Sequence, residues 1–180
     1  MFNQEYELNP VTHITADAIG KPGARIFYLQ ARTEGTTITV IVEKIQLITL
    51  AESVEQFLDE IQERQPHLEV ASSVYEEDAM RIQMPIDPLF RVGDMGLIYD
   101  DERDMVCIVA KELLLTEDKE KKESEVRLWC SRSQLYALAV WSLEISSRGR
   151  PICPQCGQPE EPEGHFCPKK NGRKKHLTVD

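Results

Sequence analysis

Three cysteines and one histidine lie close together near the end of the chain. Cys153 and Cys156 form a Cys-Pro-Gln-Cys-Gly turn. His165 and Cys167 follow within the sequence Gly-His-Phe-Cys-Pro. A Cys-x-x-Cys turn can point two thiolates at one ion while backbone amides bond the sulfurs. Structural Zn2+ takes four nitrogen or sulfur ligands, whereas catalytic zinc keeps an open position. The four side chains therefore predict a closed, structural zinc site.

Two alternatives concern this cysteine-rich segment. A redox Cys-x-x-Cys pair usually opens a helix, and the prolines around it disfavour a long helix here: Pro151, Pro154, Pro159, Pro162 and Pro168. The second alternative concerns the fourth ligand. The His-x-Cys spacing places neighbouring side chains on opposite sides of an extended segment, so His176 could replace His165.

Other candidate motifs fit turns better than active sites. Segment 20–25, Gly-Lys-Pro-Gly-Ala-Arg, could contact a phosphate, but it lacks the Walker spacing and a following helix. The acidic segment 100–104 lacks the glycine and the terminal glutamate of an EF-hand loop. His13 and His67 are isolated from any recognisable nucleophile motif. We therefore expect a strand-entry turn at 20–25, a solvated turn at 100–104 and no catalytic residues.

Charge is unevenly distributed along the 180 residues. Residues 150–180 contain six basic and four acidic side chains, which leaves 15 basic and 27 acidic ones in residues 1–149. An acidic body disfavours nonspecific nucleic-acid binding, because Lys and Arg contacts to phosphate supply most of that affinity. Only the basic run over 169–175 could make such contacts, and a short solvated basic terminus is the commoner explanation.

The composition is that of a cytoplasmic protein. No apolar run approaches a membrane span, and the first residues have neither a basic nor an apolar region of a secretory signal. Cys107 and Cys130 lie in apolar, strand-like runs, where a free cysteine acts as a small buried hydrophobe. We expect a reducing compartment and no membrane partner.

Hydrophobic periodicity predicts strands and two helices in the body. We expect strands at 24–32, 36–44, 90–99, 105–115 and 125–130, and helices at 47–65 and 135–145. Ser131 and Gln134 have the spacing of a capping box that opens the second helix. This helix is apolar nearly all round, so we expect the C-terminal segment or a second copy of the chain to cover its outer face.

The two predicted helices begin alike. Segments 46–51 and 134–139 both read Gln-Leu-x-x-Leu-Ala, and each follows a β-rich segment. This suggests two strand-strand-helix halves packed into one sheet with both helices on one face. We predict an α+β fold: a two-layer domain of antiparallel sheet and two main helices over residues 1–149, followed by a zinc-binding tail over 150–180.

Several segments together resemble a bacterial family of unknown function. They are residues 20–32, 90–95, 153–157, 164–168 and the Asn-Gly pair at 171–172. The resemblance spans nearly the whole chain, and it implies a complete protein whose terminal motif is a real unit. The family has no established activity, substrate or partner.

Three classes of function remain. We expect a non-enzymatic protein-interaction module whose zinc-stabilised tail docks a protein partner. The second class is nucleic-acid binding through the basic tail, although Phe166 is the only aromatic residue after Trp141 that could stack on a base. The third is an enzyme that acts on a phosphorylated small molecule near Lys21 and Arg25. The oligomeric state stays open.

Overall fold

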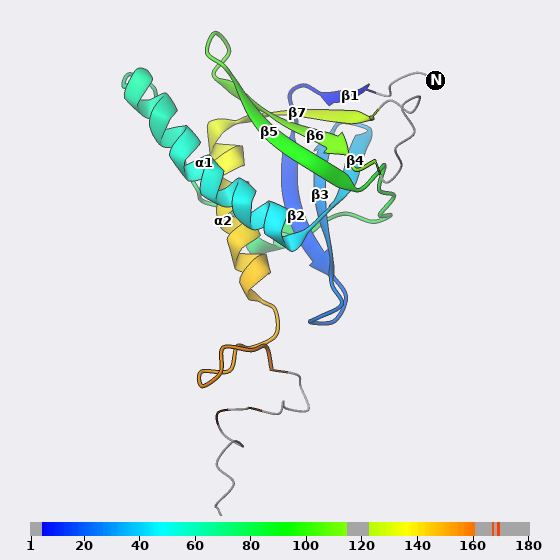
Figure 1. Ribbon diagram of the computed structural model, residues 1–180. Coiled ribbons are helices and arrows are strands. Elements are labelled where there is room, and N and C mark those ends of the chain that lie inside the picture. Colours follow the sequence, from blue (N-terminus) through cyan, green and yellow to red (C-terminus); the bar gives the residue numbers. More distant parts are fainter. Residues whose placement is uncertain (1–4, 115–122, 161–166, 168, 170–180) are drawn as a thin grey trace, which may run out of the picture.

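A computed structural model describes residues 5–114, 123–160, 167 and 169 (Figure 1). Seven strands and two α-helices lie within these ranges, with a short 3-10 helix at Glu77–Met80. The strands are β1 (Glu5–Leu8), β2 (His13–Ile19), β3 (Ile26–Thr33), β4 (Thr36–Val42), β5 (Val92–Asp100), β6 (Met105–Glu112) and β7 (Glu125–Ser131). The helices are α1 (Lys44–Arg64) and α2 (Arg132–Ser147).

The predicted α+β class is confirmed, with two differences in the sheets. The strands form two sheets rather than one, in the orders β2-β3-β4 and β1-β7-β6-β5. Pairing is antiparallel except that β1 runs parallel to β7. A few backbone hydrogen bonds link the two sheets: the Ile41 N–H donates to Phe90 O and the Leu89 N–H to Thr39 O, both at 2.9 Å, and the Val11 N–H donates to Trp129 O at 2.8 Å. The two sheets therefore meet at two places: the end of β4 lies beside the segment that leads into β5, and the end of β7 lies beside the segment that leads into β2.

Each half of the body is three antiparallel strands followed at once by a helix. β2, β3, β4 and α1 form the first half, and β5, β6, β7 and α2 form the second. Both helices begin with a capping box that has glutamine at its third position, Gln46 in α1 and Gln134 in α2. The predicted capping box at Ser131 is confirmed, since its hydroxyl accepts from the Gln134 N–H at 3.1 Å. The repeat unit thus contains one strand more than the strand-strand-helix unit predicted from the sequence.

The two helices pack against each other, and α2 also packs on β2 (Figure 1). Each buries an apolar stripe at helical spacing: Leu47, Leu50, Val54, Leu58 and Ile61 in α1, and Leu135, Leu138, Trp141 and Ile145 in α2. Burial of such stripes against a sheet is the main stabilising contribution in a two-layer domain. The core lies between this helix pair and the two sheets.

Several residues of the body surround Trp141 of α2. Trp141 is fully buried, and its indole N–H donates to Ala16 O at 2.6 Å. The ring of Tyr75 packs edge-on against it with centroids 5.5 Å apart, and the guanidinium groups of Arg81 and Arg148 lie over it at 5.7 and 5.1 Å. Tyr75, Arg81 and Arg148, which lie outside the tail, therefore bury this side of α2. The expectation that the tail or a second copy of the chain covers the outer face of the helix stays a prediction.

None of the helices within the described ranges is both long enough and apolar enough to cross a membrane.

Candidate metal centre

A tight turn after α2 positions the first two cysteines. The Gly157 N–H donates to Cys153 O and the Cys153 N–H donates to Gln158 O, both at 2.9 Å. Gly157 has a φ of 73°, a left-handed conformation that glycine adopts without strain. The local sequence Cys-Pro-Gln-Cys-Gly therefore folds into a knuckle that holds Cys153 and Cys156 on one side.

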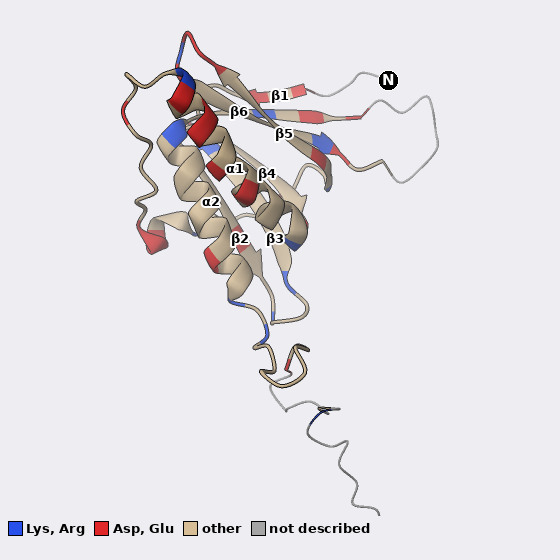
Figure 2. Cartoon of the chain, turned by 60° about the vertical axis from the view of Figure 1, so that its left-hand side comes forward, with Lys and Arg blue, Asp and Glu red and all other residues tan. Residues whose placement is uncertain are grey.

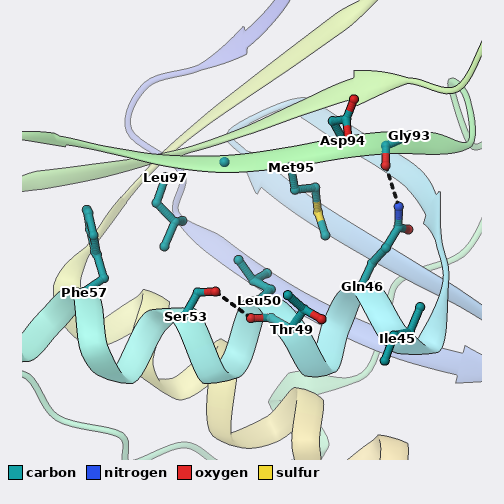
Figure 3. A pocket seen from close by; sticks show the side chains of 11 residues that line it. Ile45, Gln46, Thr49, Leu50, Ser53, Phe57, Gly93, Asp94, Met95 and Leu97 are labelled. Atoms are coloured by element: carbon teal, nitrogen blue, oxygen red, sulfur yellow. Dashed lines mark hydrogen bonds between the residues drawn. The ribbon is translucent and has the colours of Figure 1, made fainter.

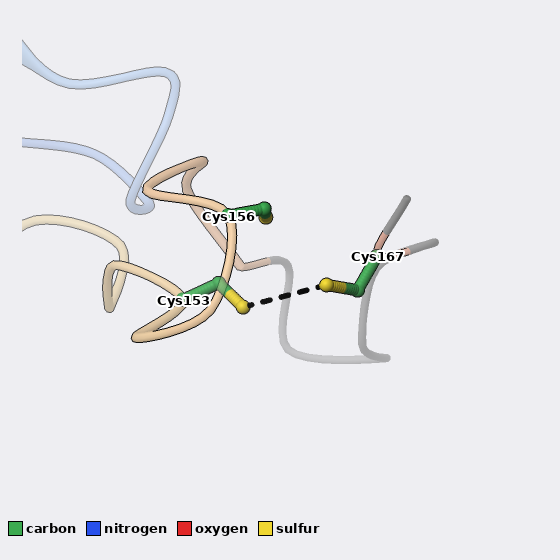
Figure 4. Close-up of side chains that lie close together, drawn as sticks. All are labelled: Cys153, Cys156 and Cys167. Carbon is green, nitrogen blue, oxygen red and sulfur yellow. Dashed lines mark hydrogen bonds between the residues drawn. The ribbon is translucent and has the colours of Figure 1, made fainter. Parts of the chain in front are cut away.

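The third cysteine, Cys167, joins this knuckle from eleven residues after Cys156. The Sγ atoms of Cys153, Cys156 and Cys167 all lie within 4.8 Å of one another, and those of Cys153 and Cys167 are 3.9 Å apart (Figure 4). Two thiolates bound at ~2.3 Å to one tetrahedral Zn2+ lie about 3.8 Å apart, whereas a disulfide requires ~2.05 Å. Cys153 and Cys167 are also buried. The geometry of the three sulfurs therefore fits a tetrahedral metal site.

Protonation of the thiols controls metal capture. A backbone hydrogen bond from Gln158 lowers the pKa of Cys156, but burial and the adjacent thiols of Cys153 and Cys167 outweigh it, so the pKa is raised above 9.0. A metal must then displace protons from the sulfurs, and its affinity should rise with pH. The two candidates for the fourth ligand, His165 and His176, lie outside the described residues.

A protein-family model matches residues 6–167, a range that begins in β1 and ends at the third cysteine. Its description is "Protein of unknown function (DUF3090)". The chain belongs to the DUF3090 family. Searches of curated proteins and of solved structures found no match. The match covers both halves of the body together with Cys153, Cys156 and Cys167, so the DUF3090 region includes the thiol cluster and stops before the basic run.

The phosphate candidate of the DUF3090 body, segment 20–25, has a clear structural role. Arg25 donates from Nη1 to Ile145 O at 3.0 Å, and its guanidinium lies 5.0 Å from the ring centre of Phe27. Ile145 belongs to the last turn of α2, where carbonyl groups lack helical partners and a cation is favourable. Arg25 therefore caps α2 and joins it to β3.

The acidic segment 100–104 forms the β5–β6 turn predicted for it. Asp100 Oδ1 accepts from the N–H groups of Glu102 and Arg103, each at 3.1 Å. A second role of Asp104 was not visible in the sequence: this residue has a φ of 48° and forms an ion pair with the buried Arg132 at 2.7 Å. The Tyr99 hydroxyl also donates to Asp104 at 2.8 Å. This cluster attaches the hairpin to the start of α2.

The other candidates in the DUF3090 body are His13, Cys107 and Cys130, and their surroundings in the protein shift the pKa of each. Burial and the nearby Arg32 lower the pKa of His13. Burial raises the pKa of Cys107 to about 11 and that of Cys130 to about 12, so both thiols are protonated at neutral pH. Both cysteines are fully buried in β6 and β7, which confirms their interpretation as small hydrophobes.

One feature of the DUF3090 fold was missed by sequence reasoning: a groove of about 370 Å³ between α1 and β5 (Figure 3). Met95 and Leu97 point from β5 toward Leu50 and Phe57 of α1, and these four side chains form the apolar floor of the groove. Gln46 closes one end by donating to Gly93 O at 2.9 Å. Because the two walls are more than thirty residues apart in sequence, no local motif marks the groove.

Proposed function

We propose that this protein is a zinc-stabilised protein-interaction module. One Zn2+ is held by Cys153, Cys156, Cys167 and His165, and it has a structural role. The observation that carries the zinc assignment is the thiol cluster, in which three sulfurs from two separate segments lie at the spacing of a zinc tetrahedron. Four protein ligands leave no open position on the ion, so the metal orders the chain after α2 rather than acting on a substrate.

The α1–β5 groove supports the interaction role. It combines an apolar floor with a strand at the edge of a sheet, and both features are typical of surfaces that bind polypeptides. The cysteine turn follows α2 at the opposite end of the body from the β5–β6 turn (Figure 1). Among the described residues, none of those that line the groove belongs to the cysteine turn, so variants of the metal centre and of the groove can be made separately.

The zinc assignment is tested by elemental analysis of protein purified without chelators. We expect about one equivalent of zinc with all cysteines reduced. Metal-free protein with intact thiols would refute the assignment.

The interaction role is tested by quantitative affinity capture from an extract of the source cells. We expect one or a few proteins to be retained in near-stoichiometric amounts by the zinc-loaded chain. Capture of no protein above the level of an unrelated acidic bait would refute the interaction role.

Nucleic-acid binding is a second candidate, and one cluster favours it. Arg25 Nη2 and Lys44 Nζ lie 3.2 and 3.9 Å from the position that a Cβ on Gly149 would occupy, and the Arg150 side chain packs on Gly23. These cations gather beside the cysteine turn of an otherwise acidic chain (Figure 2). A duplex or single strand should then bind with an affinity that falls steeply with salt, and Lys44→Gln should flatten the slope. Absence of nucleic-acid binding at physiological salt would exclude this second candidate and leave protein interaction as the proposed role.

A further inference from the structure

The outer edge of β5 has free backbone groups. β5 is the last strand of its sheet, beyond β6. The Leu113 N–H donates to Arg91 O on the β5 side, whereas the Glu112 N–H donates to Ser124 O on the β7 side. Since backbone groups alternate along a strand, the odd-numbered residues of β6 bond to β5. Their β5 partners are the even-numbered residues from Asp94 to Asp100.

Met95, Leu97 and Tyr99 therefore direct their N–H and C=O groups away from β6. Within the parts of the chain that the structure describes, no backbone group outside the sheet bonds to them. At Gly93 the edge is already occupied, because Gln46 takes its carbonyl. The free edge thus begins directly after Gln46 and continues to the β5–β6 turn, a length that suits a short added strand.

The side chains along this edge open onto the α1–β5 groove. Met95 and Leu97 are half-buried and point toward α1, while Ile45 at the start of α1 is 65% exposed. A Cβ at Gly96 would point to the opposite face of the strand, where no other atom lies within 4 Å, so that face is open as well. A strand added beside β5 would place every second side chain over this apolar floor.

The groove is bordered by negative charge. Asp94 is the one charged residue among those that line it. The neighbouring face of α1 is acidic from its middle to its C-terminal end (Figure 2), and it consists of Glu52, Glu55, Asp59, Glu60 and Glu63. The nearby cations of α1 are at its two ends, where Lys44 is exposed and Arg64 pairs with Glu60 at 3.8 Å. This border attracts a cationic segment and repels a second copy of a chain whose net charge is −10.

We propose that the free edge of β5 and the α1–β5 groove bind an extended, cationic segment of a partner protein. The segment adds a strand beside β5 and hydrogen-bonds to the backbones of Met95, Leu97 and Tyr99. Its apolar side chains lie between β5 and Ile45, and its Lys and Arg side chains lie beside Glu52 and the rest of the acidic face. This inference rests on the proposed interaction role, for which it names the site and the chemistry of the partner.

The test is selection of peptides of ~10 residues from a random library on the full-length, zinc-loaded protein, since about this length spans β5. We expect the selected peptides to alternate apolar with basic residues. Synthetic copies should shift the backbone amide resonances of Met95, Leu97 and Tyr99 in NMR titrations, and their affinity should fall as salt rises.

Two matched pairs of variants locate the site. Ile45→Ser should weaken peptide binding about tenfold, because Ile45 becomes buried on binding, whereas Val74→Ser removes another exposed apolar side chain elsewhere and should not. Glu52→Lys should weaken binding severalfold, whereas Glu34→Lys makes the same change of net charge in the β3–β4 turn and should change it little.

The outcomes separate this inference from the proposed function. Selected peptides that are acidic, that shift other amides, or that are insensitive to Ile45→Ser would overturn the groove assignment, as would recovery of no binding peptide. If a cellular partner is still captured in those cases and Ile45→Ser leaves its capture unchanged, the interaction role stands with a different surface. Loss of that capture in Ile45→Ser but not in Val74→Ser supports the groove as the docking site.

Discussion

Gln46 and Gln134 make equivalent hydrogen bonds in the two halves of the molecule. Each is the third residue of its helix, and its amide oxygen accepts from the N–H of the capping residue, at 2.8 Å in α1 and 2.9 Å in α2. Each amide nitrogen reaches two consecutive carbonyls of the other half. Gln46 lies 3.1 and 2.9 Å from Val92 O and Gly93 O, and Gln134 lies 3.5 and 3.3 Å from Val11 O and Thr12 O.

The strand register shows that these carbonyls occupy matching positions. Two residues before the capping residue of α1, Ile41 pairs with Tyr28, which in turn pairs with Asp17. Two residues before the capping residue of α2, Trp129 pairs with Cys107, which in turn pairs with Ile98. Val11 precedes Asp17 by six residues, as Val92 precedes Ile98. The halves are therefore related by an approximate twofold arrangement in which each helix start holds the strand start of the other half, which supports a duplicated architecture.

Replacing either glutamine by glutamate should destabilise the body. Gln46→Glu and Gln134→Glu keep an oxygen for the capping N–H but lose the amide donor and bring a carboxylate toward two carbonyls. We expect each to lower the free energy of unfolding by about 1–2 kcal/mol at neutral pH. Urea denaturation monitored by circular dichroism measures this.

Gln56→Glu is the control for these variants, because Gln56 is on the exposed face of α1 and bonds only to Glu60 at 3.0 Å. Its effect should stay near 0.5 kcal/mol or less. Equal effects of all three substitutions would show that the contacts between the halves do not stabilise the fold.

Cys153→Ser should lose the metal while the body keeps its fold. The hydroxyl is a poor ligand for Zn2+, and the residues that bury the core belong to segments outside the cysteine turn. We expect zinc content to fall from about one equivalent to nearly none, with unchanged near-ultraviolet circular dichroism. Cys107→Ala, which removes a cysteine far from the cluster, should retain the zinc. Global unfolding of Cys153→Ser would mean that the tail belongs to the main core.

Thiol alkylation should divide the five cysteines into two groups. In zinc-loaded protein at mildly alkaline pH we expect little modification. After chelation, Cys153, Cys156 and Cys167 should react, while Cys107 and Cys130 stay protected because burial shields them and holds their pKa values at about 11 and about 12. Mass spectrometry counts the adducts. Rapid modification of Cys130 in folded protein would contradict its buried position.

Tyr99 should contribute to stability that is lost in alkali. Burial and the hydrogen bond to Asp104 raise its pKa from 10.0 to about 12. A raised pKa means that the folded state binds the proton more tightly, so this contribution is present below pH ~10 and declines as pH rises toward about 12. In urea denaturation the difference in unfolding free energy between wild type and Tyr99→Phe should shrink over that window. A constant difference would exclude this linkage.

Asp104 should behave in the opposite sense. The hydrogen bonds from Arg132 lower the pKa of this carboxyl below 3.8, so its contribution is present above that value and is lost as pH falls through the lower, folded-state pKa. Asp104→Asn should therefore be less stable than wild type at neutral pH and nearly equal to it in strong acid. A difference that persisted in acid would assign the effect to packing or backbone strain at this residue instead.

A chain that ends at residue 149 should remain folded and keep the oligomeric state of the full-length chain. Tyr75, Arg81 and Arg148 cover Trp141 without the cysteine turn. Removal of residues 150–180 should therefore leave the indole ring covered. We expect the same subunit number by size-exclusion chromatography as for the full-length chain, and no binding of a hydrophobic dye. Aggregation or dye binding by the truncated chain would show that the tail covers α2.

Features that depend on neighbouring residues could be predicted from the sequence. The cysteine turn, the capping box at Ser131 and the apolar stripe of α1 each arise from contacts a few residues apart, so their spacing is visible in the chain. The fourth metal ligand remains a sequence prediction, because His165 lies outside the described residues.

Strand β2 escaped prediction because two of its buried side chains are polar. Thr15 donates to Met80 O at 2.6 Å, and Asp17 forms an ion pair with Arg81 at 2.9 Å. These partners lie more than sixty residues away. Burial of a polar side chain is favourable only when such partners are in place, so the sequence pattern alone indicates a loop.

The groove required the assembled fold for a different reason. A strand shows its hydrophobic pattern in the sequence, but whether it lies at the edge of a sheet depends on the order of all the strands. Here β5 is an edge because, among the described strands, it pairs with β6 alone, and α1 is held beside it by the hydrogen bonds from Gln46 to Val92 and Gly93 of the other half. These contacts join segments that are distant in the sequence, so they stabilise the arrangement only once the chain has folded.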